Sequence, residues 1–177
     1  MNVTIRRATV EDAAALAAVA AATFPLACPP HTTDEAKAHF IATVLSEERF
    51  TEYLADPARD LLLAETPEEV VVGYVMLVHG EPADADAAGA VRVRPTIELS
   101  KCYVLPGHHG AGVSGLLMRA SLDAATARKA GGIWLGVNEE NERAQRFYGK
   151  HGFERVGSKH FLVGDRLEHD WVMERVL

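Results

Sequence analysis

Short apolar runs alternate with amphipathic stretches along the 177 residues of the chain. Runs rich in β-branched residues and leucine predict strands at 3–8, 61–65, 70–78, 96–104, 133–137, 153–163 and 166–176. Helices are expected from a cap at Thr9 through the alanine-rich run that follows it, and at 34–45, 47–56, 112–129 and 141–151. Residues 80–89 predict an acidic loop. This order of elements predicts one α/β domain over residues 1–177, with a mixed sheet flanked by helices.

The N-terminal segment has an alanine-rich run but lacks the pattern of a secretory signal. Glu11 and Asp12 stand between the arginines and that run, where a signal peptide needs an uninterrupted apolar core. Residues 13–33 carry no charge, yet their three prolines argue against one continuous membrane-spanning helix. The sequence therefore predicts a cytoplasmic protein with no membrane partner.

The cysteines and histidines predict neither a disulfide framework nor a metal site. The two cysteines are Cys28 and Cys102, which are too few for a framework. Cys28 and His31 have a spacing typical of metal ligands, but no second pair completes a site. The adjacent His108 and His109 would face opposite ways on an extended segment. We therefore expect no metal.

Charge is unevenly distributed along the chain. The net charge of −7 disfavours a nucleic-acid partner, because such binding needs a basic surface. Residues 1–105 carry 8 basic and 16 acidic side chains, whereas residues 106–177 carry 10 and 9. The acidic part is able to attract a cationic ligand.

The fourth expected strand runs into a glycine-rich segment that then enters a helix. Such a junction points backbone N–H groups and the helix dipole at one place, which suits a pyrophosphate. A Walker A loop is disfavoured because Val113 occupies the position of the required lysine. A dinucleotide fingerprint fits Gly110, Gly112 and Gly115, with Glu139 placed to approach a ribose, but only one βαβ unit is present.

The segment at 135–153 adds a longer pattern. It contains a strand followed by Asn138-x-x-Asn141, Ala144-x-x-Phe147-Tyr148 and Gly152-Phe153. This pattern resembles the GCN5-related N-acetyltransferase (GNAT) superfamily. The glycine-rich segment is similar to the pyrophosphate loop of that family, with His109 in place of the usual Arg or Gln and Ser114 in place of the last small residue. The ending at 160–177 looks like that of PaiA-type polyamine (spermidine/spermine) N-acetyltransferases.

The resemblance implies a fold and a reaction. The fold is a mixed, mostly antiparallel sheet of about seven strands, splayed apart at the strands that bind the cofactor. The reaction is direct transfer of an acetyl group from acetyl-CoA to an amine in a ternary complex. Family members often form homodimers, so a homodimer is an expectation here.

The resemblance also implies the contacts to acetyl-CoA. The start of the helix would hold the pyrophosphate, and the strand before it would pair with the pantetheine arm and polarise the thioester oxygen. Asn141 has an alternative role as a helix cap, and the two roles are compatible. The phosphates could also use the cations Arg128, Lys129, Arg143, Arg146 and Lys150. The implied cofactor-binding residues are Cys102, Tyr103, Val104, His109, Gly110, Ala111, Gly112, Val113, Ser114, Gly115, Asn138, Asn141, Ala144, Phe147, Tyr148 and Lys150.

Two residues are expected to be catalytic. By the family pattern, Tyr148 is the general acid for the departing thiolate; the alternative is a half-buried aromatic whose hydroxyl is satisfied elsewhere. An alkyl ammonium with a pKa of ~10.4 must lose a proton before it attacks, which a carboxylate can accept. The resemblance makes Glu98 the candidate general base, because it lies on the strand before the glycine-rich segment, where histone-type family members carry their catalytic glutamate. The alternative for Glu98 is an ordinary strand carboxylate that faces water or pairs with Lys101 or Arg94. Cys102, four residues after Glu98, is expected on the same face of the strand, as a packed thiol or as an acetyl carrier.

The expected acceptor is a small primary amine, with a polyamine as one member of that class. Glu98, the loop at 80–89, Asp165, Glu168 and Asp170 could line its path, although the same acids also describe a solvated surface. Amino acids, aminoglycosides and peptide amines stay open as acceptors. Two other functions stay open as well: a non-catalytic acyl-CoA-binding regulatory module and a dinucleotide-dependent oxidoreductase.

Overall fold

The computed structural model describes residues 2–109 and 112–177. One seven-stranded sheet runs through them in the order β1-β2-β3-β4-β5-β7-β6. All neighbouring strands are antiparallel except β4 and β5, which are parallel. The expected mixed, mostly antiparallel sheet is therefore confirmed. The strands are β1 (Thr4–Arg7), β2 (Arg59–Glu65), β3 (Val71–His79), β4 (Thr96–Val104), β5 (Gly132–Asn138), β6 (Glu154–Val163) and β7 (Arg166–Val176).

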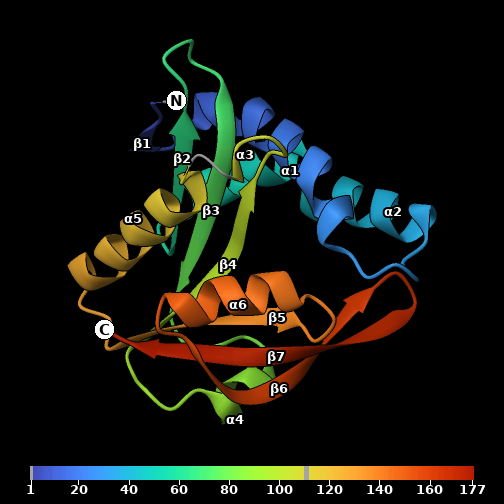
Figure 1. Ribbon diagram of the computed structural model, residues 1–177, viewed down its shortest axis with the longest axis vertical. Helices are drawn as coiled ribbons and strands as arrows, with labels where there is room; N and C mark the ends of the chain where they lie inside the picture. Colours follow the sequence, from blue (N-terminus) through green and yellow to red (C-terminus); the bar gives the residue numbers. More distant parts are fainter. Residues whose placement is uncertain (1, 110–111) are drawn as a thin grey trace.

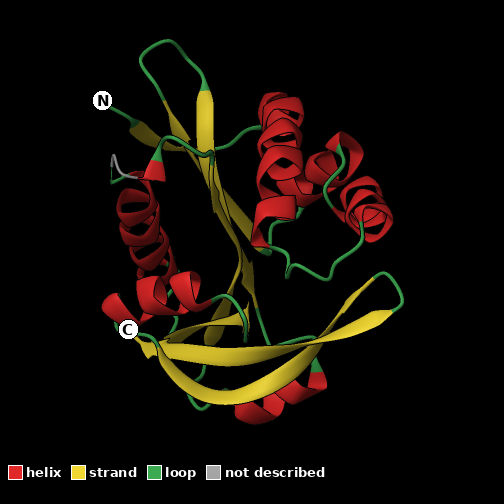
Figure 2. Cartoon of the chain, turned by 45° about the vertical axis from the view of Figure 1, so that its right-hand side comes forward, coloured by secondary structure: helices red, strands yellow, loops and turns green. Residues whose placement is uncertain are grey.

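Helices cover both faces of the sheet. Figures 1 and 2 show α1 to α3 on one face and α5 with α6 on the other. The side chains of Thr33, Ser46 and Asn141 accept backbone N–H groups at the starts of α2, α3 and α6, as their residue types favour. The helices are the 3-10 turn η1 (Val10–Asp12), α1 (Ala13–Ala27), α2 (Asp34–Val44), α3 (Glu47–Ala55), α4 (Ala85–Ala90), α5 (Val113–Ala127) and α6 (Glu142–Lys150).

Helix α4 (Ala85–Ala90) overlaps the loop that the sequence predicts at 80–89, so that prediction is wrong for residues 85–89. The carboxylate of Asp84 accepts the backbone N–H of Ala87 at 2.9 Å, which caps the helix. Ala87 itself is buried in a small cluster with Trp134 and Val172. A helix of six residues is too short to show a periodic pattern, and its packing partners come from distant strands.

The alanine-rich helix forms part of the core. Residues Val10–Ala27 have the length and composition of a membrane-spanning helix. In this fold, Leu16 and Ala20 are fully buried against a cluster that includes Phe50 and Tyr74. The apolar face of this helix is thus used in packing against the sheet.

The two halves of the sheet separate between β4 and β5. Their pairing covers only Thr96–Glu98 against Gly132–Trp134, and beyond these residues the strands diverge (Figure 1). This confirms the expected splay at the cofactor-binding strands. On its other side β4 carries a bulge, because Met76 pairs with Lys101 and Leu77 with Leu99. Ser100 is therefore an extra residue in β4.

Candidate active site

The bulge decides which side chains of β4 share a face. Glu98 lies opposite Val78, which packs with the core under α1 and α3. Cys102 lies opposite Val75, which belongs to the core under α5. The predicted shared face of Glu98 and Cys102 is therefore wrong, because one extra residue reverses the alternation of the strand.

Glu98 lies where the two halves of the sheet diverge, as the last residue of β4 that pairs with β5. Burial raises the pKa of its carboxyl, while the charges of Lys159 and Lys101 oppose the increase. Arg94 binds Glu81 instead, and within the described residues no ion pair joins Glu98 to Lys101. A carboxylate with a raised pKa is well suited to accept a proton from an ammonium group.

Tyr148 approaches β4 from α6. Its ring lies 5.5 Å from that of Phe147 and 5.9 Å from that of Phe153. Burial raises the pKa of its phenol well above the ordinary value, and Cys102 and Tyr103 act in the same direction, which places the phenol close to β4. Over residues 2–109 and 112–177 no hydrogen bond occupies its hydroxyl. The phenol is therefore protonated at neutral pH and available to donate.

The start of α5 is open to a ligand. Gly112 begins the helix with φ +76°, a left-handed conformation that favours glycine. A Cβ added at Gly112 or at Gly115 would meet no atom of the described residues within 4 Å. Val113 is buried and Ser114 is half-buried, whereas Gly110 and Ala111 lie outside the described residues. The first N–H groups of a helix have no partner within the helix, and at an open helix start such groups fit the pyrophosphate of CoA.

The other residues expected to contact CoA lie in the loop before α5, on α6 and on β4. Partial burial and the nearby charge of Arg143 lower the pKa of His109, so the loop before α5 lies within electrostatic range of the first turn of α6. Asn141 caps α6, since its side-chain oxygen accepts the N–H of Ala144 at 3.1 Å. Ala144 and Phe147 pack against the larger core. On β4, Tyr103 is half-buried and Val104 buried, both beyond the pairing with β5.

Two of the predicted phosphate-binding cations lie elsewhere. Lys150 is at the opposite end of α6, where it lines a surface cavity of about 640 Å³ with Arg92 and Arg175. Arg128 binds the carboxylate of Asp60 at 3.0 Å. The structure does not bring these two cations together with the start of α5.

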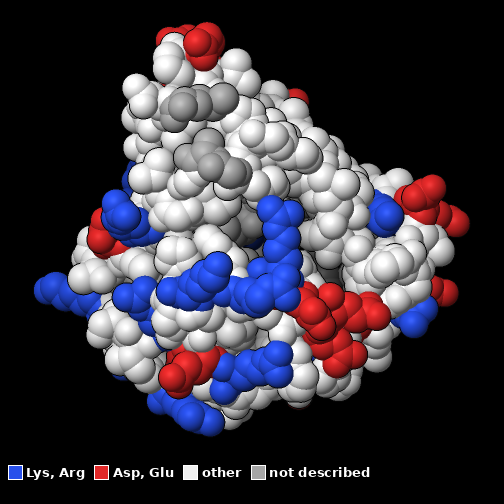
Figure 3. Space-filling model, in the orientation of Figure 1, with Lys and Arg blue, Asp and Glu red and all other residues white. Residues whose placement is uncertain are grey.

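On the face of the molecule that is seen in Figure 1, basic and acidic side chains occupy two separate regions. Figure 3 shows basic side chains over α6 and acidic side chains gathered beside them. Arg143 and Arg146 are exposed on α6, and Glu139 and Glu140 are exposed in the loop before it. An anionic ligand is favoured near the first region and a cationic one near the second.

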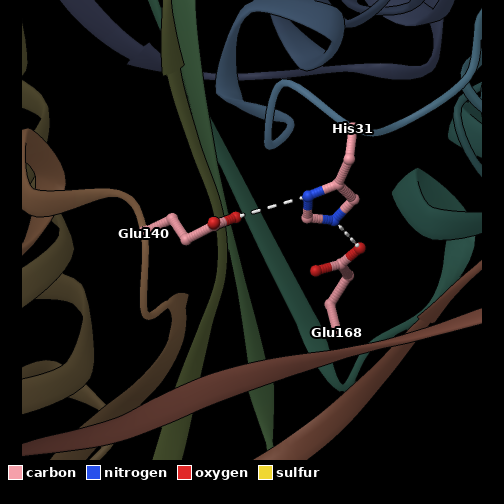
Figure 4. A group of neighbouring side chains, drawn as sticks. All are labelled: His31, Glu140 and Glu168. Atoms are coloured by element: carbon pink, nitrogen blue, oxygen red, sulfur yellow. Dashed lines mark hydrogen bonds and ion pairs between the residues drawn. The ribbon is translucent and has the colours of Figure 1, made fainter.

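A histidine joins three segments on the side of the sheet that carries Glu98. His31 Nε2 lies 2.6 Å from a carboxylate oxygen of Glu168, and His31 Nδ1 lies 3.7 Å from Glu140 (Figure 4). The ligand atoms of the three residues lie within 4.8 Å of one another, and their types are ones that metals accept. Asn138 adds its amide 3.5 Å from Glu168. The loop after α1 is thereby fastened to β7.

Two lysines also lie on this side: Lys101, which sequence reasoning named only as a possible partner of Glu98, and Lys159, which it did not single out. Burial lowers the pKa of Lys101 to about 8, an effect that Glu98 opposes. Lys159 forms a buried ion pair with Asp170 at 3.7 Å. The alternating carboxylates Glu168 and Asp170 indicate a polar face of β7, but no local pattern singles out Lys159, since its partners lie on other strands.

Comparisons with known proteins agree with this geometry. The model of the acetyltransferase (GNAT) family matches residues 22–153. An uncharacterized N-acetyltransferase of Mycobacterium tuberculosis (strain H37Rv) is 47% identical over 166 residues, which cover 94% of this chain and 98% of the relative. The crystal structure of the PaiA N-acetyltransferase of Thermoplasma acidophilum in complex with coenzyme A has a TM-score of 0.78 at 18% identity and covers 100% of both chains. Mutant forms of the spermidine/spermine N-acetyltransferase SpeG of Vibrio cholerae have a TM-score of 0.66 at 19% identity, over 99% of this chain and 95% of theirs.

Proposed function

We propose that this chain, which belongs to the acetyltransferase (GNAT) family and is an acetyl-CoA-dependent N-acetyltransferase, acts on a small primary amine. The proposed acceptor is a member of the polyamine class. The observation that carries the proposal is a set of three carboxylates, one half-buried and two buried, on one side of the diverging strands. Glu98, Glu168 and Asp170 all lie there, in a setting that favours cations. Two structural neighbours, PaiA and SpeG, are N-acetyltransferases, and the name of SpeG specifies spermidine and spermine.

The proposed roles follow the two sides of the opening. Deprotonating an alkyl ammonium at pH 7 costs roughly 4–5 kcal/mol. Glu98 takes this proton, directly or through water, and its raised pKa suits the transfer. Backbone N–H groups of β4 beyond its pairing with β5 polarise the thioester oxygen. Tyr148, protonated at neutral pH, donates a proton to the thiolate of CoA.

An acceptor screen tests this proposal. Purified protein with acetyl-CoA is incubated with polyamines, amino acids, aminoglycosides and a peptide with a free N-terminus, and released CoA is measured. We expect release with polyamines and other small primary amines. Release only with a peptide or an aminoglycoside would overturn the assigned acceptor class.

Thermal unfolding separates the ligand classes before any acceptor is known. We expect acetyl-CoA to raise the midpoint of unfolding, because a ligand that binds only the folded state stabilises it. NAD and ATP at the same concentration are the controls. Stabilisation by NAD without stabilisation by acetyl-CoA would favour the oxidoreductase alternative.

A further inference from the structure

The side chain of Lys159 runs along the surface of the sheet, across the neighbouring strands. Lys159 is on β6, and its ammonium lies 3.7 Å from a carboxylate oxygen of Asp170 on the neighbouring β7. A Cβ added at Gly136, on the next strand β5, would lie 2.5 Å from Cε of Lys159. The lysine side chain therefore reaches from β6 across β7 to β5, and it can do so because residue 136 has no side chain.

Asp170 is the carboxylate that this lysine covers. It is 6% exposed, and its Oδ1 atom has no hydrogen-bond partner among the described residues. A buried carboxylate oxygen without a partner is unfavourable. Its neighbour on the same face of β7, Glu168, is bound by His31 at 2.6 Å. Asp170 thus keeps capacity for one more donor.

Asp170 and the candidate base, Glu98, lie on the same face of the sheet. Glu98 is in register with Trp134, two residues before Gly136 on β5. Residues two apart on a strand share a face, so Glu98, Gly136 and Asp170 lie along one side of the sheet. The charge of Lys159 acts on both Glu98 and Asp170. The lysine therefore occupies the path between the two carboxylates.

We propose that Asp170 is a specificity-determining residue that binds a second ammonium group of the acceptor. The reacting amine lies at Glu98, and the second ammonium of the same molecule displaces the ammonium of Lys159 from Asp170. Lys159 is the resting counter-ion that keeps this buried carboxylate paired before the acceptor binds. This inference rests on the proposed function and adds that the preferred acceptor carries two positive charges.

The test compares two acceptors that differ by one ammonium group, 1-aminobutane and 1,4-diaminobutane, with acetyl-CoA saturating. For Asp170→Asn we expect kcat/KM to fall at least tenfold for the diamine and to change less than twofold for the monoamine. Asp123→Asn, an exposed carboxylate on α5, is the matched control and should leave both values unchanged. Thermal unfolding verifies that each variant is folded.

A second variant tests the role of the lysine. Lys159→Met removes the resting counter-ion and keeps most of the stem, so we expect KM for the diamine to fall several-fold while KM for the monoamine changes less than twofold. Equal effects on both acceptors in both variants would overturn the inference while leaving the amine acetyltransferase intact. A parent protein that acetylates no amine would instead overturn the proposed function, and this inference with it.

Discussion

The hydroxyl of Tyr148 has no hydrogen-bond partner among the described residues and is held close to β4, which makes it the sharpest test of the reaction. Tyr148→Phe removes the proton donor and keeps the ring contacts with Phe147 and Phe153. We expect kcat to fall by about 10² or more, as for the loss of a general acid. The affinity for CoA, measured by calorimetry, should change less than about twofold, because Tyr148 acts on the departing thiolate. Unchanged kcat would remove Tyr148 from the mechanism.

Glu98 predicts a pH dependence with a definite sign. Because burial raises the pKa of its carboxyl, the ionised base is lost at a higher pH than for an exposed glutamate. We expect kcat/KM of the parent to rise with pH through this raised pKa. Glu98→Gln should lower kcat/KM and abolish this acid limb. Glu154→Gln, an exposed change on β6, is the control and should keep the parent profile. A Glu98→Gln profile like that of the parent would leave the base unassigned.

At the scale of elements, one buried carboxylate joins three strands and a helix. Asp60 on β2 is 1% exposed and accepts hydrogen bonds from Arg7 on β1, His79 on β3 and Arg128 at the end of α5. Burial alone would raise the pKa of Asp60, but these three hydrogen bonds lower it to about 2. Between pH 3.8 and 2 the unfolded state therefore binds more protons than the folded state.

This cluster gives a prediction for stability. Asp60→Asn leaves His79 and two partly exposed arginines, Arg7 and Arg128, without their carboxylate partner. It should reduce the free energy of unfolding by about 1–2 kcal/mol at pH 7, since solvent screens the arginines. The stabilisation is present above the unfolded pKa and lost as pH falls through the folded one, so the difference between parent and variant should shrink towards pH 2. Urea unfolding at several pH values measures both effects. Asp34→Asn, on the exposed start of α2, should change stability little. A difference that grew at acid pH would contradict this account.

Local sequence patterns predict where a strand begins and ends better than they predict on which face of the sheet each of its side chains lies. The bounds of β4 and β7 agree with the prediction because alternation and turn residues are local features. The bulge at Ser100 depends on how β4 pairs with β3, and a shift of one residue moved Cys102 away from Glu98. Helix α4 likewise depends on the contact of Ala87 with Trp134.

For the whole molecule, the uneven charge predicts how CoA binding responds to salt. The chain has a net charge of −7, yet exposed cations gather over α6 near the start of α5 (Figure 3). We expect the Kd for CoA to rise several-fold between about 50 and 500 mM salt, because exposed charges are screened over this range. Arg143→Gln should weaken binding at low salt and reduce this dependence. Arg49→Gln, on α3, is the control. A salt dependence unchanged by Arg143→Gln would exclude that cation from the site.

The sequence by itself determined the order of the elements, the GNAT resemblance and the candidates Tyr148 and Glu98. It could do so because strand alternation, helix caps and the spacing from Asn138 to Phe153 are properties of neighbouring residues. Only the tertiary structure decided which of these side chains face one opening. It directed Arg128 to Asp60, joined His31 to Glu168 and laid Lys159 over Gly136 towards Asp170. Each of these contacts joins residues far apart along the chain, so its geometry is set by strand register and burial, which no local pattern contains.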